Sequence, residues 1–249
     1  MNQLSKWYQP LKIIIPVHNE GGNFASLYDQ LAMIRTSFEA FVIYDFGGDN
    51  TIPAVNRAID RGDHRFHLHR NDTYPGAAGA LLTGFRLAAA GPVLVVMADL
   101  SDDLAQVDRM VQLYRDGYHL VAASRYARGG SQISGPLLKR TLSRCAGRSL
   151  RLLRGLPTSD ATNSFRLYDA EMLNRLQLES RSGFEITLEI TVKAFLAGYR
   201  IAEVPATWHD RKNGESHFRL WRWLPSYLKW YFFAFRPRAL HGTKLSAAS

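Results

Sequence analysis

The chain has a single cysteine, Cys145, among its 249 residues. One cysteine excludes an intramolecular disulfide and any zinc site built from several cysteines. It is compatible with a reducing compartment such as the cytosol. Residues 1–12 are polar and contain no apolar core region, so we expect no secretory signal peptide. No stretch of the sequence offers the roughly 20 apolar residues that a membrane-spanning helix needs.

The sequence also lacks internal repeats, low-complexity segments and any recognised nucleic-acid-binding motif. It has an excess of basic residues, with a formal net charge of +9, which favours an anionic partner. Nucleic acid, an anionic membrane surface and a phosphorylated substrate all carry suitable charge, and the missing motif argues against nucleic acid. The length and the hydrophobic content of 46% predict one large domain, or one domain with an appendage.

Short apolar runs alternate with helical patterns over the first half of the chain. We expect strands at 11–17, 41–44, 66–69, 93–97 and 120–123, and helices at 23–34, from 53, at 76–89 and at 107–114. This alternation predicts an α/β fold with a doubly wound, mostly parallel sheet. After Tyr126 the pattern changes to predicted helices at 137–153 and 187–197, with an edge or hairpin strand at 201–208.

The segment from Val93 to Asp103 is the most informative part of the chain. An apolar run stops abruptly at three carboxylates, Asp99, Asp102 and Asp103. The run is typical of a strand that is covered on both faces of a parallel sheet. Carboxylates just beyond such a strand lie where open α/β sheets bind ligands, and oxygen ligands suit Mg²⁺ or Mn²⁺ on a diphosphate. The alternative is a solvated acidic turn that caps the next helix through Asp102 or Asp103.

Four segments carry recognisable motifs, namely Ile13–Glu20, Tyr44–Thr51, Gly76–Ala80 with Gly84, and Ala98–Ser101. Together they resemble the motifs of glycosyltransferase family 2, which has the GT-A fold. The segments similar to its dolichol-phosphate mannose synthase-like branch are Ser124–Tyr126 with Gly129–Gly130, Asp160–Tyr168, Gly198–Pro205 and Arg211–Ser216. The chain departs from the family pattern at Met97, at Tyr44 and Phe46, and at Tyr74–Pro75, where a lysine is common.

The resemblance implies three groups of functional residues. Those implied for nucleotide-sugar binding are Pro16, His18, Glu20, Asp45, Gly76 and Asp99. Those implied for binding the acceptor phosphate are Arg125, Lys139, Ser143 and Arg211. Asp99 and Ser101 are the implied ligands of Mg²⁺ or Mn²⁺, and Asp99 and Arg125 are the implied catalytic residues. Asp102 or Asp103 could compensate for Met97, and Glu20 could instead serve as a helix N-cap partner.

A basic group follows the predicted sheet. Arg125, Lys139, Arg140, Ser143 and Arg144 could surround a phosphate, for which arginine is well shaped. The alternative, a solvated basic helix face, applies most to Arg148 and Arg151.

A phosphate acceptor needs no general base, because its second pKa near ~6 leaves it ionised at neutral pH. Catalysis would then depend on alignment and on neutralising the leaving group. The resemblance therefore implies an inverting, metal-dependent enzyme that transfers a sugar from a GDP- or UDP-linked donor to a polyprenyl phosphate. One alternative is a soluble glycosyltransferase with a glycan or small hydroxyl acceptor, for which Asp160 is the first candidate base. Another is a non-catalytic sugar-nucleotide-binding homologue, which Met97, Tyr44 and Phe46 motivate.

The C-terminal segment is rich in aromatic residues. Residues 217–235 hold three Trp, two Tyr and four Phe, interleaved with Arg and Lys. Such residues favour the boundary of a bilayer. We therefore expect a GT-A domain at 1–216, an amphipathic helical extension at 217–249, and a cytoplasmic protein held peripherally on the membrane. The alternative is a helix docked on the domain or in a dimer. Pro225 is expected to kink or divide this helix.

Overall fold

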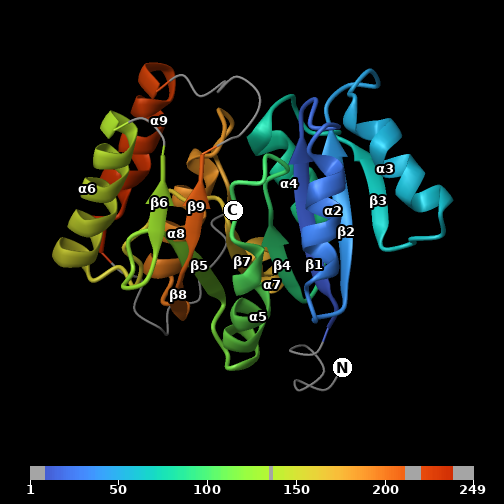
Figure 1. The fold of residues 1–249 in the computed structure, drawn as a ribbon. Coiled ribbons are helices and arrows are strands. Elements are labelled where there is room, and N and C mark those ends of the chain that lie inside the picture. Colours follow the sequence, from blue (N-terminus) through green and yellow to red (C-terminus); the bar gives the residue numbers. More distant parts are fainter. Residues whose placement is uncertain (1–8, 135–136, 211–219, 238–249) are drawn as a thin grey trace, which may run out of the picture.

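The computed structural model describes residues 9–134, 137–210 and 220–237, with no side chains described at 139 and 220–222. A seven-stranded sheet in the order β3-β2-β1-β4-β7-β5-β8 forms its centre (Figure 1). The strands are β1 (Leu11–Val17), β2 (Phe38–Tyr44), β3 (Phe66–Arg70), β4 (Pro92–Val95), β5 (Leu120–Ser124), β7 (Arg166–Asp169) and β8 (Ile201–Pro205). Only β7 runs antiparallel to its neighbours. The predicted α/β fold with a mostly parallel sheet is confirmed.

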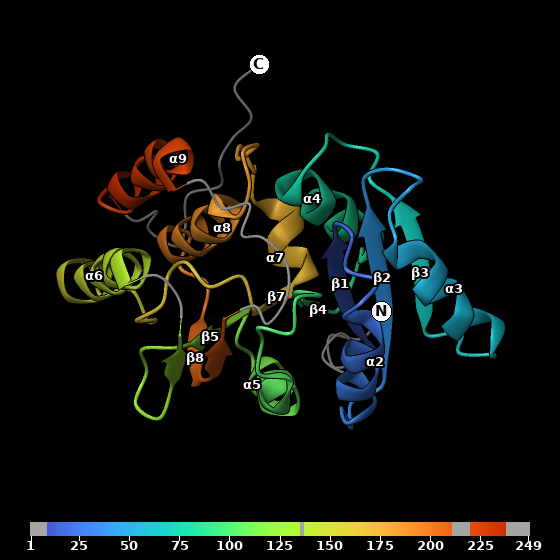
Figure 2. The ribbon, with the colours of Figure 1, turned by 45° about the horizontal axis from the view of Figure 1, so that its top comes forward.

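The apolar run of β1 explains why helices cover both faces of the sheet. Ile13 and Ile15 belong to one hydrophobic core and Ile14 to the other, and all three are fully buried. Successive strand residues point to opposite faces, so a strand that is apolar throughout needs cover on both sides. The helices on the first face are α2 (Phe24–Ala32), α3 (Thr51–Asp60) and α5 (Val107–Arg115), and those on the second include α4 (Ala77–Leu87), α7 (Ala170–Arg175) and α8 (Glu185–Leu196) (Figure 2).

The antiparallel strand β7 was not predicted, because its sequence combines Arg166 and Asp169 with only two apolar residues. Arg166 is nevertheless fully buried. Its Nε donates to the carbonyl of Asn163 at 2.6 Å, its Nη2 donates to the carbonyl of Asp160 at 2.5 Å, and Nη1 bonds the side chain of Thr191. These hydrogen bonds offset the cost of burying a charge, so β7 can occupy the middle of the sheet.

The predicted strand at 201–208 is in fact two strands. The first is β8, at the edge of the main sheet, and the second is β9 (Thr207–His209), which pairs in parallel with β6 (Ser131–Ile133). The chain enters β6 through Gly130, where an added Cβ would lie 2.3 Å from the carbonyl oxygen of Ser124. Gly130 therefore permits a close backbone approach between the start of β6 and the end of β5.

Two helices lie together at one end of the molecule, α6 (Leu137–Arg154) and α9 (Leu220–Phe233) (Figures 1 and 2). Trp230 of α9 is 1% exposed and packs in the core shared with α8. Pro225 lies inside α9, so the prediction that it divides the helix is wrong. It is an exposed residue of the second turn, so only the first turn loses a hydrogen bond. Within the described residues, no helix is both long and apolar enough to span a bilayer.

Candidate active site

The turn that follows β3 brings two of the predicted donor-site residues together. The carboxylate of Asp45, just past β2, accepts a hydrogen bond from the backbone N–H of Gly76 at 2.9 Å and one from Asn71 Nδ2 at 2.7 Å. Gly76 adopts a φ of 102°, a conformation that favours glycine, at the start of α4. Asp45 thus fixes the turn from which α4 begins, at the carboxyl end of β2.

The loops that follow β1 and β2 are joined by hydrogen bonds. The carboxylate of Asp49, 1% exposed, accepts from the backbone N–H groups of Asn19 at 3.1 Å and Thr51 at 2.8 Å. Thr51 Oγ1 in turn accepts from the N–H of Glu20 at 2.9 Å. Gly21 lies so close that an added Cβ would be 2.2 Å from the carbonyl oxygen of Asn50. The loop that carries His18 and Glu20 is therefore firmly positioned.

The other predicted donor residues lie along the same loop and strand. Pro16 is buried in β1, while His18 is exposed and contacts the ring of Phe46 edge-on at 5.4 Å. Glu20 Oε2 accepts a hydrogen bond from Asn23 Nδ2 at 2.7 Å. Asn23 is the N-cap position of α2, so Glu20 contacts the side chain of the N-cap residue but makes no capping hydrogen bond to the helix N–H groups.

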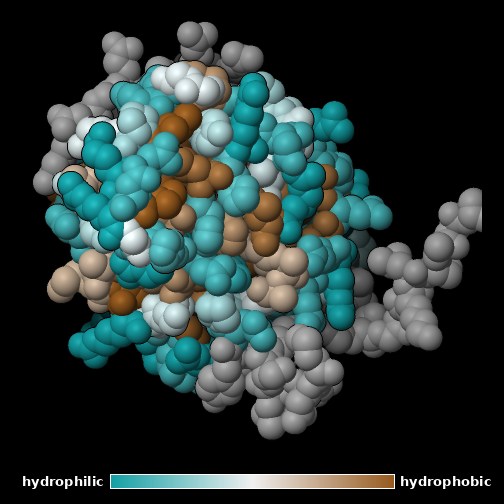
Figure 3. Space-filling model, turned by 90° about the vertical axis from the view of Figure 1, so that its right-hand side faces the viewer, coloured by the Kyte–Doolittle hydropathy of each residue, from teal (hydrophilic) through white to brown (hydrophobic). Residues whose placement is uncertain are grey.

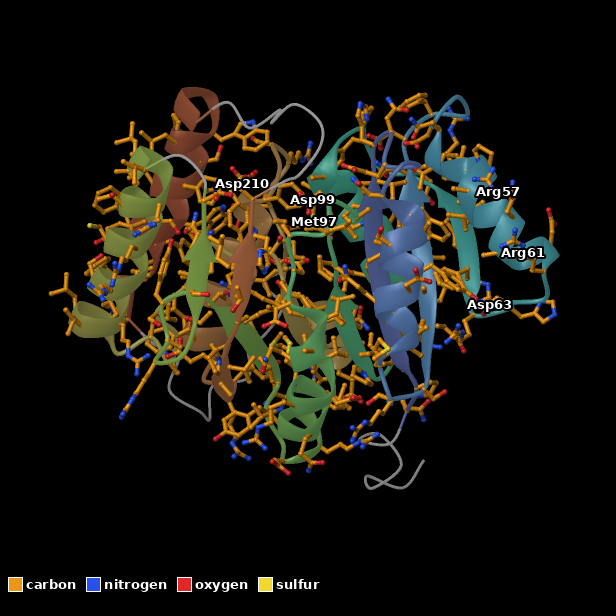
Figure 4. All side chains as sticks on the ribbon, in the orientation of Figure 1. Arg57, Arg61, Asp63, Met97, Asp99 and Asp210 are labelled. Carbon is orange, nitrogen blue, oxygen red and sulfur yellow. The ribbon has the colours of Figure 1, made fainter. Side chains whose placement is uncertain are left out.

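The predicted metal-binding residues form a buried turn beyond β4. Asp99 is 8% exposed, and its Oδ1 accepts from the N–H of Ser101 at 3.1 Å. Asp102 Oδ2 accepts from the N–H of Met97 at 2.8 Å. Burial, together with the negative charge of Asp99, raises the pKa of Asp102 to about 8. Figure 4 shows Met97 and Asp99 toward the middle of the sheet.

This turn has the donor chemistry of a Mg²⁺ or Mn²⁺ site. Asp99, Ser101 and Asp102 supply only oxygen atoms, which these hard cations prefer. Among the described residues, no three acidic, histidine or cysteine side chains are grouped closely enough to hold a metal ion by themselves. Mg²⁺ is usually bound through one or two carboxylates together with substrate phosphates, so the residues fit a cation that is shared with a diphosphate. Asp103 is less suited to compensate for Met97, because its Oδ2 accepts from the N–H of Thr207 at 3.1 Å.

The predicted acceptor residue Arg125 is paired with a buried carboxylate. Its Nε and Nη2 donate to the two oxygens of Asp160 at 2.7 and 2.9 Å, and Asp160 is fully buried. Burial opposes ionisation of both groups, but the attraction between them outweighs it. The pKa of Arg125 is therefore raised and that of Asp160 is lowered. Both side chains are charged at neutral pH.

A second predicted acceptor residue contacts Arg125 directly. Ser143 Oγ accepts from Arg125 Nη2 at 3.1 Å and from the hydroxyl of Tyr126 at 3.2 Å, and lies 2.7 Å from Thr162 Oγ1. Lys139 belongs to α6, but its side chain is not described, and Arg211 lies outside the described residues. The structure thus brings together two of the four residues predicted for the acceptor phosphate.

A basic pocket of about 330 Å³ lies over these acceptor residues. It is lined by Arg125, Arg140 and Arg144, with Tyr126 and parts of β6. Along the same helix, Arg151 pairs with Glu203, and Arg148 is exposed in a separate pocket of about 470 Å³. Neither of these two pockets is lined by Asp45 or Asp99.

The two-stranded sheet connects the acceptor pocket with the carboxylate turn. Ser131 and Gln132 of β6 line the pocket. The partner strand β9 reaches the turn, because the N–H of His209 donates to the carbonyl of Ser101 at 3.1 Å. Figure 4 shows Asp210, the next residue, near Asp99. The basic pocket therefore lies at the β6 strand of this small sheet, and the carboxylate turn lies at its β9 strand.

Comparison with known proteins identifies the family. A model described as glycosyl transferase family 2 matches residues 12–177. The chain belongs to glycosyltransferase family 2. An undecaprenyl-phosphate mannosyltransferase of Micrococcus luteus is 31% identical over 209 residues, with 82% of this chain and 85% of that protein covered. A polyprenol monophosphomannose synthase of Mycolicibacterium smegmatis is 28% identical, with 82% and 79% covered.

A more distant relative and the solved structures agree with this assignment. A dolichol-phosphate mannosyltransferase of Pyrococcus furiosus is 27% identical over 84% of this chain, although only 59% of that protein is covered. The glucosyl-3-phosphoglycerate synthase of Mycobacterium tuberculosis, in complex with uridine diphosphate, superposes with a TM-score of 0.66 at 15% identity, covering 94% of this chain and 84% of that one. This likeness confirms the GT-A fold of the family 2 chain.

Sequence reasoning missed the partners that hold the basic residues in place. In this family 2 chain, Asp160, which was considered as a general base, is the ion-pair partner of Arg125. Thr162 and Tyr126 complete the group around Ser143. The sequence offered no local signal for this pair, because Arg125 and Asp160 are 35 residues apart.

Proposed function

We propose that this chain is an inverting glycosyltransferase that transfers a sugar from a GDP- or UDP-linked donor to a polyprenyl phosphate. The observation that carries the proposal is the basic pocket of Arg125, Arg140 and Arg144 beside the Asp99 turn. A pocket with three arginines suits a phosphate, and a carboxylate turn suits the cation of a nucleoside diphosphate. The names of the three relatives each specify a polyprenyl-type phosphate and mannose, so mannose is the first sugar to test.

On the donor side, the chain's own residues bind and orient the nucleotide sugar. Asp45 and the N-terminal turn of α4 offer a carboxylate and backbone groups to the nucleotide, and Pro16, His18 and Glu20 lie on the neighbouring loop and strand. Asp99 and Ser101, with Asp102 beside them, would hold Mg²⁺ or Mn²⁺. When bound, this cation would neutralise the charge that develops on the leaving diphosphate. M. tuberculosis glucosyl-3-phosphoglycerate synthase was crystallised with Mn²⁺ and uridine diphosphate, which supports use of a divalent cation in this fold.

On the acceptor side, the arginines hold the phosphate and restrict its direction of attack. Arg125 is fixed by Asp160, so its guanidinium is oriented before the acceptor arrives. Ser143, together with Lys139 and Arg211, would complete the phosphate site. The ionised phosphate attacks the anomeric carbon in line with the departing diphosphate, which inverts the configuration there.

The structure disfavours the alternative with a hydroxyl acceptor. Such an acceptor needs a general base within hydrogen-bond reach. Asp160, the candidate base, is fully buried, and both of its oxygens are held by Arg125. Because Arg125 overcomes the effect of burial and lowers the pKa of Asp160, this carboxylate is also a weak base. An acceptor that is already ionised requires no such group.

The direct test is a transfer assay with purified protein. The chain is incubated with undecaprenyl phosphate, Mg²⁺ or Mn²⁺, and a panel of labelled GDP- and UDP-sugars, and the lipid extract is examined for labelled product. We expect one donor, GDP-mannose first, to give a lipid-linked sugar. Failure of every donor would refute the acceptor assignment, while donor hydrolysis or transfer would refute the non-catalytic alternative.

Arg144→Gln is expected to raise the KM for undecaprenyl phosphate about tenfold, since a hydrogen bond from a charged group is lost. The KM for the donor should change little, because Arg144 lines the acceptor pocket, which neither Asp45 nor Asp99 lines. Arg57→Gln is the matched control, as Arg57 is also exposed but lies on α3 at the other end of the molecule (Figure 4). Equal effects of the two substitutions on the acceptor KM would contradict the placement of the acceptor.

The end of the molecule formed by α6 and α9 is proposed to contact the membrane. Among the described residues, most of the exposed large hydrophobic side chains lie on or next to these two helices. They are Leu137, Leu138, Leu142, Leu152 and Leu153 on α6, Leu228 and Phe232 on α9, and Phe235 just after it. The arginines of α6 accompany them, so the surface suits the boundary of an anionic bilayer. Hydrophilic residues cover most of the opposite end, which carries α3 and β3, with some hydrophobic residues between them (Figure 3). With it we propose a peripheral position on the cytoplasmic membrane face and a C-terminal extension at 217–249.

Phe232→Ser is expected to weaken binding to anionic lipid vesicles about tenfold, because burying one Phe side chain contributes roughly 1.5–3 kcal/mol. Phe232 is 66% exposed, so the substitution should leave the melting temperature almost unchanged. Met33→Ser is the control, since Met33 is 81% exposed at the end of α2, away from α9. Vesicle co-sedimentation measures both variants. The proposed membrane-facing surface would be contradicted if Met33→Ser weakened vesicle binding, or if Phe232→Ser left vesicle binding unchanged.

A further inference from the structure

The loop between α7 and α8 contains a residue that connects three distant parts of the chain. Ser180 is 6% exposed. Its N–H donates to Glu189 Oε2 at 2.8 Å, its carbonyl accepts from the hydroxyl of Tyr74 at 2.8 Å, and its Oγ accepts from Trp230 Nε1 at 2.8 Å. Ser180 therefore joins the loop before α4 to α8 and to the C-terminal helix α9.

Tyr74 belongs to the turn that fixes Asp45. Asn71 Nδ2 donates both to Asp45 Oδ1 and to the carbonyl of Tyr74, each at 2.7 Å. The carbonyl of Tyr74 packs against α4 so closely that a Cβ on Gly79 would be 1.8 Å from its oxygen. The position of Tyr74 is thus transmitted to Asp45 and, through it, to Gly76.

The turn itself has little other support from burial. Asp72, Thr73, Pro75 and Gly76 are exposed, whereas the ring of Tyr74 is half-buried. Burial raises the pKa of the Tyr74 phenol, so it remains protonated and donates its hydrogen bond at neutral pH. The hydroxyl of Tyr74 therefore ties an otherwise exposed turn to a buried residue.

The other side of this connection is rigid. Trp230 is 1% exposed. Glu189 is fully buried, accepts hydrogen bonds from the N–H groups of residues 179 and 180, and pairs with Lys193 at 2.7 Å. Buried polar groups that are fully satisfied in this way hold one arrangement. Ser180 is consequently a fixed anchor for the hydroxyl of Tyr74.

We propose that Tyr74 is a positioning residue for the donor site, with Ser180 and Trp230 as its anchor. This inference rests on the proposed function, in which Asp45 and the start of α4 bind the nucleotide sugar. Tyr74 acts through Asn71 and Asp45 and does not itself touch the donor. Trp230 belongs to α9, whose opposite side exposes Phe232. Hydrogen bonds through Ser180 therefore connect the turn of Tyr74 to the helix proposed to face the membrane.

The test compares Tyr74→Phe with a matched loss of a tyrosine hydroxyl. Tyr74→Phe is expected to raise the donor KM three- to tenfold, a factor typical of one lost hydrogen bond, with kcat and the acceptor KM within about twofold. Amide hydrogen exchange of residues 71–80 should accelerate. Tyr28→Phe is the control, because Tyr28 donates to Asp63 at 2.9 Å and has no link to Ser180. It should leave both readouts unchanged.

Ser180→Ala tests the anchor by removing only the Oγ that accepts the hydrogen bond from Trp230 Nε1. We expect faster amide hydrogen exchange in residues 71–80. In a double variant with Tyr74→Phe, we expect the increase in donor KM to be smaller than the product of the two single increases.

An unchanged donor KM and unchanged exchange in Tyr74→Phe would overturn the proposal, even if the melting temperature falls. Binding of UDP and GDP with Mn²⁺, measured by calorimetry, tests the positioning role of Tyr74 separately from the proposed transfer to polyprenyl phosphate. Nucleotide binding that weakens in Tyr74→Phe supports the positioning role even if no lipid product forms.

Discussion

Asp99→Asn is expected to lower transfer from the nucleotide sugar to polyprenyl phosphate about a thousandfold. The carboxylate of Asp99 is the main protein ligand proposed for Mg²⁺ or Mn²⁺, and the cation stabilises the leaving diphosphate by several kcal/mol. The measurement is the initial rate of labelled lipid formation at saturating donor, with the cation titrated over a wide range. Loss at every cation concentration is the expected result.

The substitution is chosen so that the fold survives. The side-chain oxygen of Asn can still accept the hydrogen bond that Asp99 Oδ1 accepts from the N–H of Ser101. Asp103→Asn is the control, because Asp103 lies in the same acidic segment but accepts from Thr207 and Gln106. An Asp99→Asn protein that keeps more than a tenth of its activity would contradict the metal assignment, and so would equal losses in the two variants.

Asp160→Asn is expected to destabilise the protein by about 3 kcal/mol, because it leaves the charge of Arg125 without its buried partner. It should also lower kcat/KM for the acceptor, since Arg125 is no longer held in place. The pH dependence of stability follows from the lowered pKa of Asp160. The contribution of this ion pair is complete above the ordinary aspartate pKa of 3.8 and is lost as the pH falls through the lowered value.

Denaturant unfolding at several pH values measures this effect. The difference between the wild-type protein and Asp160→Asn should be largest above pH ~4 and shrink in acid. Glu39→Gln is the control, since Glu39 pairs with Lys12 while 40% exposed, and such surface pairs contribute about 0–1 kcal/mol. If Asp160 were instead a catalytic base, its replacement would abolish transfer while leaving stability and acceptor binding unchanged.

The sequence predicted those features that depend on local pattern. The apolar runs of β1 and β4 and the alternation with helices were sufficient for the sheet, and the order of motifs was sufficient for the family. The pairing of Arg125 with Asp160 spans 35 residues, and no local pattern specifies which distant cation a buried carboxylate meets. The strand β7 was missed because its four residues include Arg166 and Asp169. Arg166 is accommodated by two backbone carbonyls of the preceding segment and by Thr191 of α8, and an apolar pattern reveals none of these bonds.

The domain boundary, the donor residues and the acceptor residues stay predictions. Asp45 and Gly76 are hydrogen-bonded to each other, and Arg125 and Ser143 are as well, which makes these pairs consistent with shared sites. Lys139 and Arg211 lie where no side chain is described. The sequence also left two roles open for Glu20, and its contact with Asn23 does not decide between them.

The reversed direction of β7 has a practical consequence. Because this strand runs against β4 and β5, the segment before it, which holds Asp160, emerges at the same rim as the ends of those strands. The residues proposed for the two substrates thereby lie toward one rim of the sheet, and the connection around Asp116, between α5 and β5, lies at the opposite rim. A cysteine introduced at Asp116, after the exposed Cys145 is replaced, therefore offers an attachment point for a fluorophore or a sensor chip that leaves both substrate entrances open.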